Sequence, residues 1–515
     1  DWRRLDVPHD WGIEGPFRID LDGYTGKLPW QGIGWYRKYF EVSSKDKKKR
    51  FYLDFDGAMA NAEVWLNGKK VGEWPYGYSS FRVDLTPYLL YDKKNVVAVR
   101  LNTEKFGSRW YPGAGLYRNV HLIVTEDAYI PVWGTYITTP SVNEKFAKVN
   151  VLTKVVLPEG ADPAKYSVET SVWNPNKQKL TAVRTSLAQM KYNNDQAEQE
   201  FVIQDPSLWS PEMPALYSAE TRLYEGDKLK DVYTTPFGIR SIEIIPDKGF
   251  FLNGKRTVFK GVCNHHDLGP LGAAVNDAAI RRQIRILKDM GCNAIRTSHN
   301  MPAPELIRAC DEMGMMIMAE SFDEWNVAKC KNGYNLLFDE WAEKDLVNLL
   351  HNFRNNPSVV MWCIGNEVPN QWNEGDTKIA KWLQDICHRE DPTRPVTQGM
   401  DAPDAVVNNN FAAVMDVAGF NYRPFKYKVN YKKLPQRIVL GSETASTVSS
   451  RGVYKFPVER KAMAKYDDHQ ASSYDVEHCG WSNLPEDDFI QHEDLPYCIG
   501  EFVWTGFDYL GEPTP

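Results

Sequence analysis

Residues 257–296 read TVFKGVCNHHDLGPLGAAVNDAAIRRQIRILKDMGCNAIR, and this stretch decides the fold class. Thr257–Cys263 is an apolar run typical of a strand. In Asn276–Met290, isoleucine and leucine recur at i, i+4 and i+7, which places them on one face of a helix that ends before Gly291. Asn293–Arg296 is predicted to be a second short strand. Strands and helices therefore alternate here, as they do in α/β folds.

The alternation continues to the end of the chain. Further strands are predicted at Met315–Ala319, Val359–Ile364, Pro395–Gln398, Val417–Asn421, Arg437–Leu440 and Cys498–Trp504. Further helices are predicted at Pro304–Met313, Asp339–Arg354 and Lys378–Arg389. Eight strands in about 270 residues predict an α/β TIM (β/α)8 barrel over residues 242–515. The helix that normally follows the eighth strand is not in the sequence, so we expect a longer natural protein or a trimmed chain.

The residues before the barrel show short strands without a helical period. Gly34–Phe40 and Ala62–Leu66 have strand patterns, and Asn67-Gly68 after the second is typical of a hairpin turn. We therefore predict an all-β jelly-roll sandwich over residues 1–126. Tyr166–Trp173 alternates with period two in the next hundred or so residues, which predicts an immunoglobulin-like sandwich over residues 127–241.

The composition is that of an ordinary globular protein and excludes several classes. Lys and Arg number 61 against 68 Asp and Glu, so the formal net charge of −7 disfavours a nucleic-acid surface. No apolar run approaches the roughly 20 residues that a membrane span needs. The eight cysteines contain no CxxC pair, so buried free thiols are expected.

The start of the chain bears on the cellular location. It begins at Asp1 without an initiator Met and without a signal-like leader, so we expect that a leader was removed or the chain was trimmed. A periplasmic or secreted location is compatible with this, and the location is left open. A homo-oligomer is likewise left open.

Polar or aromatic side chains follow nearly every predicted barrel strand. In chain order they are His265, Arg296 with His299, Glu320 with Asp323, Asn366 with Glu367, Tyr422, Glu443 and Trp504. A single glutamate after a strand is usually solvated or caps a helix. TIM-barrel enzymes place their active sites at the carboxyl ends of the strands, and a purely structural barrel has no need for so many such groups at one rim. The pattern therefore predicts an active site.

The predicted chemistry is glycoside hydrolysis, which needs two carboxyl groups across the scissile bond. Strands four and seven face each other across a barrel, so Glu367 and Glu443 can approach over the mouth. Arg296 near Glu443 would favour its carboxylate form, and that charge would hold a proton on Glu367. Trp504 would offer a flat floor to a sugar ring. Hydroxyl groups could be bound by His265, His299, Asn366 and Tyr422.

Motifs along essentially the whole chain resemble glycoside hydrolase family 2. They are Arg109–Val120, Leu208–Glu212, Phe237–Arg240, Lys260–His266, Asn293–His299, Ile364–Glu367, Gly441–Glu443 and Phe502–Trp504. The resemblance implies a retaining exo-β-glycosidase that acts through a covalent glycosyl-enzyme, with β-galactosidase as the most similar activity. It assigns Glu443 as nucleophile and Glu367 as acid/base. It assigns the first sugar subsite to His265, His299, Asn366, Tyr422 and Trp504.

The sequence departs from the family pattern at two places. Some family galactosidases bring an acidic residue from the first domain into the site, whereas Ser108–Pro112 contains none. Either Arg109 or Trp110 enters the site instead, or this loop is a buried turn of the sandwich. Some members bind magnesium after strand three, but Glu324 is followed here by Trp-Asn, which disfavours that site. No cofactor is expected to be required, and a divalent metal stays an alternative. Asp323 could instead reach sugar hydroxyls.

The expected partner is a glycoside or oligosaccharide, with neither nucleic acid nor a membrane span involved. Rival readings are a β-glucuronidase or β-mannosidase of the same family and, in a different class, a non-catalytic carbohydrate-binding protein. None of the expected sugar-binding residues carries a fixed positive charge, and Arg296 is committed to Glu443. A glucuronide carboxylate would therefore lack a cationic partner, which favours terminal β-D-galactosides.

Overall fold

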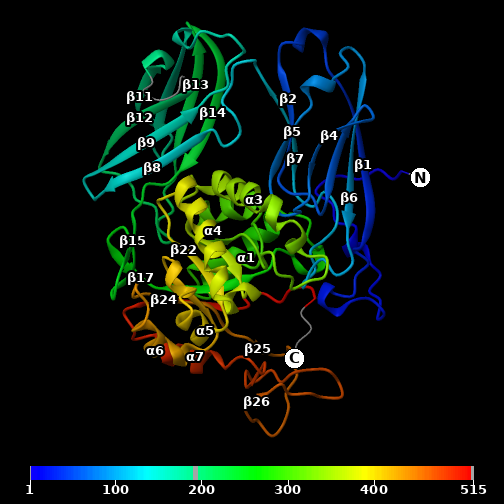
Figure 1. Cartoon of the computed structure of the whole chain (residues 1–515), viewed down its shortest axis with the longest axis vertical. Helices are drawn as coiled ribbons and strands as arrows, with labels where there is room; N and C mark the ends of the chain where they lie inside the picture. The colour runs from blue at the N-terminus through cyan, green and yellow to red at the C-terminus, as the bar shows by residue number, and fades with distance from the viewer. Residues whose placement is uncertain (1, 190–194, 512–515) are drawn as a thin grey trace.

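The computed structural model describes residues 2–189 and 195–511. Two β-sandwiches project from the same side of a closed barrel (Figure 1). The predicted fold class, two all-β sandwiches followed by a TIM barrel, is confirmed. The domain boundaries expected near residues 126 and 241 stay predictions.

The first sandwich packs a four-stranded sheet, of order β1-β6-β3-β4, on a three-stranded sheet, of order β5-β2-β7. Side chains of β6 alternate between buried and half-exposed along most of the strand, because one face of the sheet covers the core. The strands are β1 (Gly32–Glu41), β2 (Arg50–Phe55), β3 (Ala62–Leu66), β4 (Lys69–Trp74), β5 (Phe81–Asp84), β6 (Lys94–Thr103) and β7 (Val120–Thr125).

The second sandwich has the same two-layer design, with sheets of order β11-β10-β13-β14 and β12-β9-β8. Its strands are β8 (Thr135–Val142), β9 (Phe146–Lys154), β10 (Tyr166–Trp173), β11 (Lys179–Ser186), β12 (Gln196–Gln204), β13 (Tyr217–Glu225) and β14 (Lys228–Phe237). A small antiparallel sheet then leads into the barrel, formed by β15 (Ile242–Ile245), β16 (Gly249–Leu252) and β17 (Lys255–Thr257).

Eight parallel strands close the barrel, with β28 pairing with both β18 and β24. Most of their residues are buried, as expected for strands covered on both faces. The strands are β18 (Phe259–Asn264), β19 (Ala294–Thr297), β20 (Met316–Glu320), β21 (Val359–Asn366), β22 (Val396–Met400), β23 (Ala418–Asn421), β24 (Val439–Ala445) and β28 (Cys498–Trp504).

The helices surround the strands, and α1 shows why they form where they do. The side chain of Asn276 caps its first turn by accepting from the Ala279 amide, and the periodic Ile and Leu residues are buried as predicted. The helices are α1 (Asp277–Asp289), α2 (Pro304–Met313), α3 (Phe338–Phe353), α4 (Thr377–Glu390), α5 (Pro403–Asn408), α6 (Tyr427–Tyr431) and α7 (Pro485–His492). In the described part of the chain, no helix combines the length and the apolar character needed to cross a membrane.

Three details differ from the predicted elements. The first predicted barrel strand is split at Val258, so its start belongs to β17. The seventh begins at Val439 rather than Arg437, because Arg437 has a positive φ of 57° that does not fit a strand. Between β24 and α7 the chain makes a long excursion that contains β25 (Thr447–Val448), β26 (Lys461–Ala462) and β27 (Glu477–His478). None of the eight cysteines, which all lie within the described residues, forms a disulfide bond, and six of them are buried, as expected.

A buried carboxyl group joins the first sandwich to the barrel. Asp345 on α3 is fully buried and accepts hydrogen bonds from Trp74 Nε1 at 2.7 Å and Ser79 Oγ at 2.5 Å. Tyr334, in the loop before α3, donates to its other oxygen at 2.5 Å. Three donors from two domains, of which Ser79 and Tyr334 are buried and Trp74 is half-buried, therefore depend on one side chain. This shared carboxyl group fixes the sandwich against the barrel.

We expect Asp345→Ala to destabilise the protein by at least about 3 kcal/mol, because each buried donor left without a partner costs about 1–3 kcal/mol. Chemical denaturation would measure the loss. Asp339→Ala removes an exposed carboxylate from the first turn of the same helix and serves as the control. Equal stability of the two variants would contradict this role of Asp345.

Candidate active site

Arg296 on β19 organises the mouth of the barrel. Its side chain is completely buried, and its three nitrogen atoms bind groups from three other strands. Nε donates to Glu320 Oε2 at 2.5 Å, and Nη2 donates to Asn366 Oδ1 at 2.8 Å. Nη1 donates to Glu443 Oε2 at 3.0 Å. The ends of β20, β21 and β24 therefore meet on one guanidinium group, which includes the contact with Glu443 expected from the sequence.

Glu443 is held by donors on both of its oxygens. In addition to Arg296 on Oε2, the Tyr422 hydroxyl donates to Oε1 at 2.8 Å. Burial and the charge of Glu367 raise the pKa of Glu443 to about 8, although Arg296 and Tyr422 act in the opposite direction. The expectation that Arg296 keeps this group ionised thus needs correction: its effect has the expected sign, but burial outweighs it.

Glu367 directly follows β21 and is half-buried. Its Oε1 accepts a hydrogen bond at 3.0 Å from Asn421 Nδ2, at the end of β23. The same nitrogen lies 3.0 Å from Asn366 Oδ1. Asn421 therefore ties the two residues together, although the sequence identified it only as a strand end and gave it no role.

His299 and Trp504 form one wall of the site. Their rings are stacked, with centroids 5.1 Å apart and planes 7° apart. Burial, aided by Arg296, holds the pKa of His299 well below its usual value, so the ring is neutral. Its Nδ1 lies 2.8 Å from Glu320 Oε1, and Nε2 lies 3.8 Å from Glu443 Oε2. The tautomer with the proton on Nδ1 leaves Nε2 as an acceptor. Sequence reasoning noted Glu320 but did not assign it this orienting contact.

The first sandwich contributes an aromatic ring to the site. Trp110 lies 4.9 Å from the ring centroid of His265 and 5.9 Å from that of His299. His265 also lies 5.4 Å from Trp504, and burial, aided by His266, holds the pKa of His265 well below its usual value. Trp110 of this loop therefore lies against two of the predicted site residues, which favours the alternative in which the loop enters the site.

Asp323 lies between two cations that the predicted set of sugar-binding residues lacked. Arg109 donates to its two oxygens at 2.8 and 2.9 Å, and Lys329 Nζ lies 2.8 Å from Oδ1. Burial opposes ionisation, but Arg109 and Lys329 still hold the pKa of Asp323 well below its usual value. Asn366 Nδ2 donates to it at 3.2 Å. None of the predicted binding residues carries a fixed positive charge, but the expectation that a sugar carboxylate would find no cation nearby needs correction at this edge of the site.

Lys329 uses all three of its donors within the protein. Besides the carboxylate of Asp323, it binds the Asp323 carbonyl at 3.1 Å and the Asn366 carbonyl at 2.7 Å. It thus ties the loop after β20 to the backbone immediately before Glu367. The sequence contains no local signal for this contact.

Glu324, the residue considered for a magnesium site, has a structural role. Its carboxylate accepts from the backbone amides of Cys330 at 3.0 Å and Asn335 at 3.2 Å, and from that of Lys329. It therefore caps the loop that carries Lys329. Within residues 2–189 and 195–511, no three His, Cys, Asp or Glu side chains are grouped so that they could hold a metal ion.

Three family models match consecutive parts of the chain. The TIM barrel domain of glycosyl hydrolases family 2 matches residues 243–513, and the preceding domain of the same family matches residues 129–240. The galactose-binding domain-like model of glycosyl hydrolase 2 matches residues 25–109. The order of the three matches is that of the two sandwiches and the barrel.

Individual relatives agree with the family models. The β-galactosidase BoGH2A of Bacteroides ovatus is 41% identical, in a match that covers 100% of this chain and 65% of the relative. A putative β-glucuronidase of Formosa agariphila is 33% identical over 99% of this chain and 50% of its own length. The crystal structure of a β-glycosidase from Bacteroides vulgatus has a TM-score of 0.89 and 34% identity, covering 100% of this chain and 67% of that one.

This chain spans 65% and 50% of the two curated relatives, so it corresponds to part of their length. The match to the barrel model alone covers more than half of the chain. Of the two candidate carboxyl groups, Glu367 directly follows the fourth barrel strand and Glu443 lies near the carboxyl end of the seventh. The chain belongs to glycosyl hydrolases family 2.

Proposed function

We propose that this chain carries the active site of a retaining exo-β-glycosidase that hydrolyses terminal, non-reducing β-D-galactosides. The observation that supports it best is the pair of hydrogen bonds that Glu443 accepts from Arg296 and Tyr422. A second carboxyl group, Glu367, is near enough for its charge to raise the pKa of Glu443. Two carboxyl groups with unequal surroundings are what double displacement at a sugar carbon requires.

In the first step, a Glu443 oxygen attacks the anomeric carbon while the bond to the leaving oxygen breaks. Glu367 gives its proton to that oxygen, so the alcohol leaves neutral and a glycosyl ester remains on Glu443. In the second step, Glu367 takes a proton from water, whose oxygen attacks the anomeric carbon and releases Glu443. Two inversions at the same carbon retain the β configuration.

The proton arrangement follows from the contacts of the pair. Because burial and the charge of Glu367 raise the pKa of Glu443 to about 8, the two carboxyl groups together keep one proton at neutral pH. Two donors stabilise the Glu443 anion, whereas one amide from Asn421 reaches Glu367. A glycosidic oxygen against Glu367 can accept a hydrogen bond only when Glu367 holds that proton, so substrate binding selects the reactive arrangement.

The sugar would lie between the wall formed by His299 and Trp504 and the polar groups opposite. Stacking suits the CH face of a pyranose, and the neutral His299 offers Nε2 to a hydroxyl group. Asn366, His265, Tyr422 and Asp323 are the further candidates for binding hydroxyls. These roles, like the absence of a required cofactor, are part of the proposal.

A β-glucuronidase is the second candidate, and Arg109 is the observation that favours it. Its guanidinium lies at the edge of the site, where it could meet a sugar carboxylate. However, Asp323 already neutralises one of the two cations there, and Lys329 has no donor left. A neutral hexose therefore remains the better match, and the relatives named above include both activities.

We expect Glu367→Ala to lower kcat/KM about 10²–10⁴-fold on glycosides with poor leaving groups and much less on activated aryl glycosides, because a good leaving group needs little protonation. Azide should restore turnover of this variant and give a β-glycosyl azide, identified by NMR. An α-glycosyl azide would mean that the enzyme inverts, which contradicts the proposed double displacement.

The pH profile tests the coupling of the two carboxyl groups. The wild-type kcat/KM should fall above about pH 8, where the pair loses its last proton. In Glu367→Gln with a dinitrophenyl glycoside, the rate should rise with pH as Glu443 ionises. Because the charge of Glu367 raises the pKa of Glu443, removing that charge should move the midpoint of the rise in rate below pH 8. A midpoint at or above pH 8 would argue against the coupling between Glu367 and Glu443. Glu374→Gln, which removes an exposed carboxylate, is the control and should leave the pH profile unchanged.

Substrate preference is tested with nitrophenyl β-galactoside and β-glucuronide. We expect kcat/KM to favour the galactoside by at least about a hundredfold, which corresponds to a mismatch near 3 kcal/mol for a poorly paired carboxylate. Equal or reversed preference, abolished by Arg109→Gln, would establish the second candidate instead. Absence of turnover on any aryl glycoside would favour a carbohydrate-binding protein without catalysis.

A further inference from the structure

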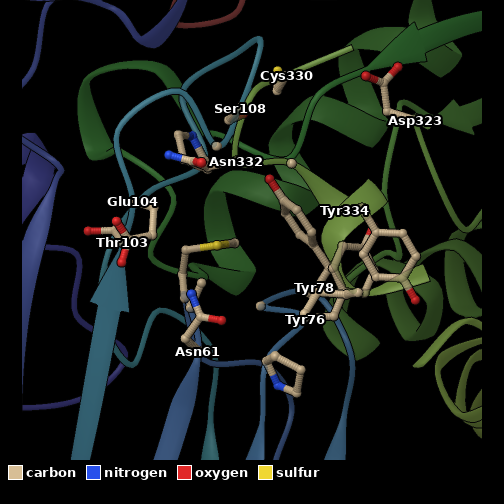
Figure 2. Close-up of a pocket in the computed structure, with 18 of the residues that line it drawn as sticks. Asn61, Tyr76, Tyr78, Thr103, Glu104, Ser108, Asp323, Cys330, Asn332 and Tyr334 are labelled. Carbon is tan, nitrogen blue, oxygen red and sulfur yellow. The ribbon is translucent and has the colours of Figure 1, made fainter. Parts of the chain in front are cut away.

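A large cavity adjoins the site at the junction of the first sandwich and the barrel. Its volume is about 480 Å³, and its lining shares Arg109, Trp110, His299 and Asp323 with the site described above. Asp323 is seen at the edge of the cavity in Figure 2. Glu367 and Glu443 do not line it. On one side lie the end of β6 and the segments just before β3 and just after β4, and on the other lies the loop between β20 and α3. Neither domain could form this cavity without the other.

The chemistry of the lining suits a carbohydrate. Figure 2 shows polar side chains from the sandwich on one side of the cavity and tyrosines on the other: Asn61, Thr103 and Glu104 against Tyr76, Tyr78 and Tyr334. Aromatic faces combined with a few amide and hydroxyl groups match the CH faces and hydroxyls of a sugar. The size falls within the range of about 300–1,000 Å³ typical of small-molecule sites.

Several polar atoms of the lining have unused bonding capacity. Tyr78 is 7% exposed, and its oxygen accepts from Trp110 Nε1 at 2.9 Å, but its own O–H has no acceptor among the described residues. Asn61 and Asn332 donate through their amide nitrogens to backbone carbonyls, while their side-chain oxygens receive no bond from the part of the chain that the structure describes. Donors and acceptors are thus available to a ligand with hydroxyl groups.

Arg109 stands where the cavity meets the site. Nε and Nη2 bind Asp323, whereas Nη1 has no partner within residues 2–189 and 195–511. The side chain is 36% exposed. A substituent that extends into the cavity from a sugar bound at Glu367 and Glu443 would pass Arg109 Nη1, which could donate a hydrogen bond to it.

The position of the cavity indicates which end of a substrate it would hold. It is bounded by His299, which lies 3.8 Å from Glu443, and not by Glu367, which faces the leaving group in the proposed mechanism. The cavity therefore extends from the ring hydroxyls of the bound sugar and not from its anomeric oxygen.

We propose that this cavity is a second sugar subsite, which holds a further neutral sugar attached to a hydroxyl of the galactosyl residue being transferred. The inference rests on the proposed function and extends it, because the enzyme would then accept a substituted galactoside as well as a terminal one. In that reaction the bond from the inner anomeric carbon to the leaving oxygen breaks and water supplies the new hydroxyl. The bond between the two sugars stays intact.

The test compares nitrophenyl β-galactoside with nitrophenyl glycosides of disaccharides that carry one extra hexose at O2, O3, O4 or O6 of the galactose. At least one disaccharide glycoside should release nitrophenol together with the intact disaccharide, identified by mass spectrometry. Its kcat/KM should be within tenfold of that for the galactoside, or higher. If the galactoside is cleaved but no intact disaccharide is released, the second subsite is refuted.

A variant that fills the cavity separates this subsite from the catalytic centre. Asn102→Trp puts a large side chain at a position that lines the cavity, at the end of β6, and it should lower the ratio of disaccharide to monosaccharide kcat/KM at least tenfold. Ile33→Trp is the matched control, because Ile33 pairs with Asn102 across the sheet, is exposed and does not line the cavity. An unchanged ratio in Asn102→Trp would overturn the subsite. Failure of the wild type on every aryl glycoside would overturn the proposed function, and the subsite with it.

Discussion

The buried positive charge of Arg296 is the constraint on which the site depends. A guanidinium with no exposed surface must be neutralised and hydrogen-bonded, because an unpaired buried charge costs many kcal/mol. Glu320 and Glu443 are its two carboxyl partners, and Asn366 supplies a neutral acceptor. These three groups lie at or near the carboxyl ends of three different strands. Because the guanidinium group is planar and rigid, binding all three fixes those strand ends relative to one another.

The same burial that orders the carboxylates also sets their acidity. Glu443 lies in a dry interior beside a second carboxyl group, so its pKa rises to about 8 despite the contact with Arg296. Glu320 behaves similarly, since burial raises its pKa to about 7 while Arg296 opposes the rise. Proton positions in such a cluster belong to the group as a whole, and a bound substrate can redistribute them at low cost.

The barrel by itself would form an incomplete site. Arg109 and Trp110 reach it from the first sandwich, and the buried Asp345 locks that sandwich in place through Trp74 and Ser79. The sandwich therefore closes one side of the mouth and, together with the loop after β20, encloses a cavity next to it. A substitution at the interface between the first sandwich and the barrel would therefore shift the candidate sugar-binding side chains through these contacts.

The sequence by itself determined the order of strands and helices and the residues at the strand ends. These follow from local periods, such as the Ile and Leu spacing of α1, and from the rule that parallel strands present their carboxyl ends at one rim. Only the tertiary structure decided which groups touch. Arg109 and Asp323 are 214 residues apart in the sequence. Lys329 binds the Asn366 carbonyl, and no sequence pattern predicts that contact. The acidity of Glu443 was likewise beyond the sequence, because the balance between a neighbouring cation and burial depends on how much water the fold excludes.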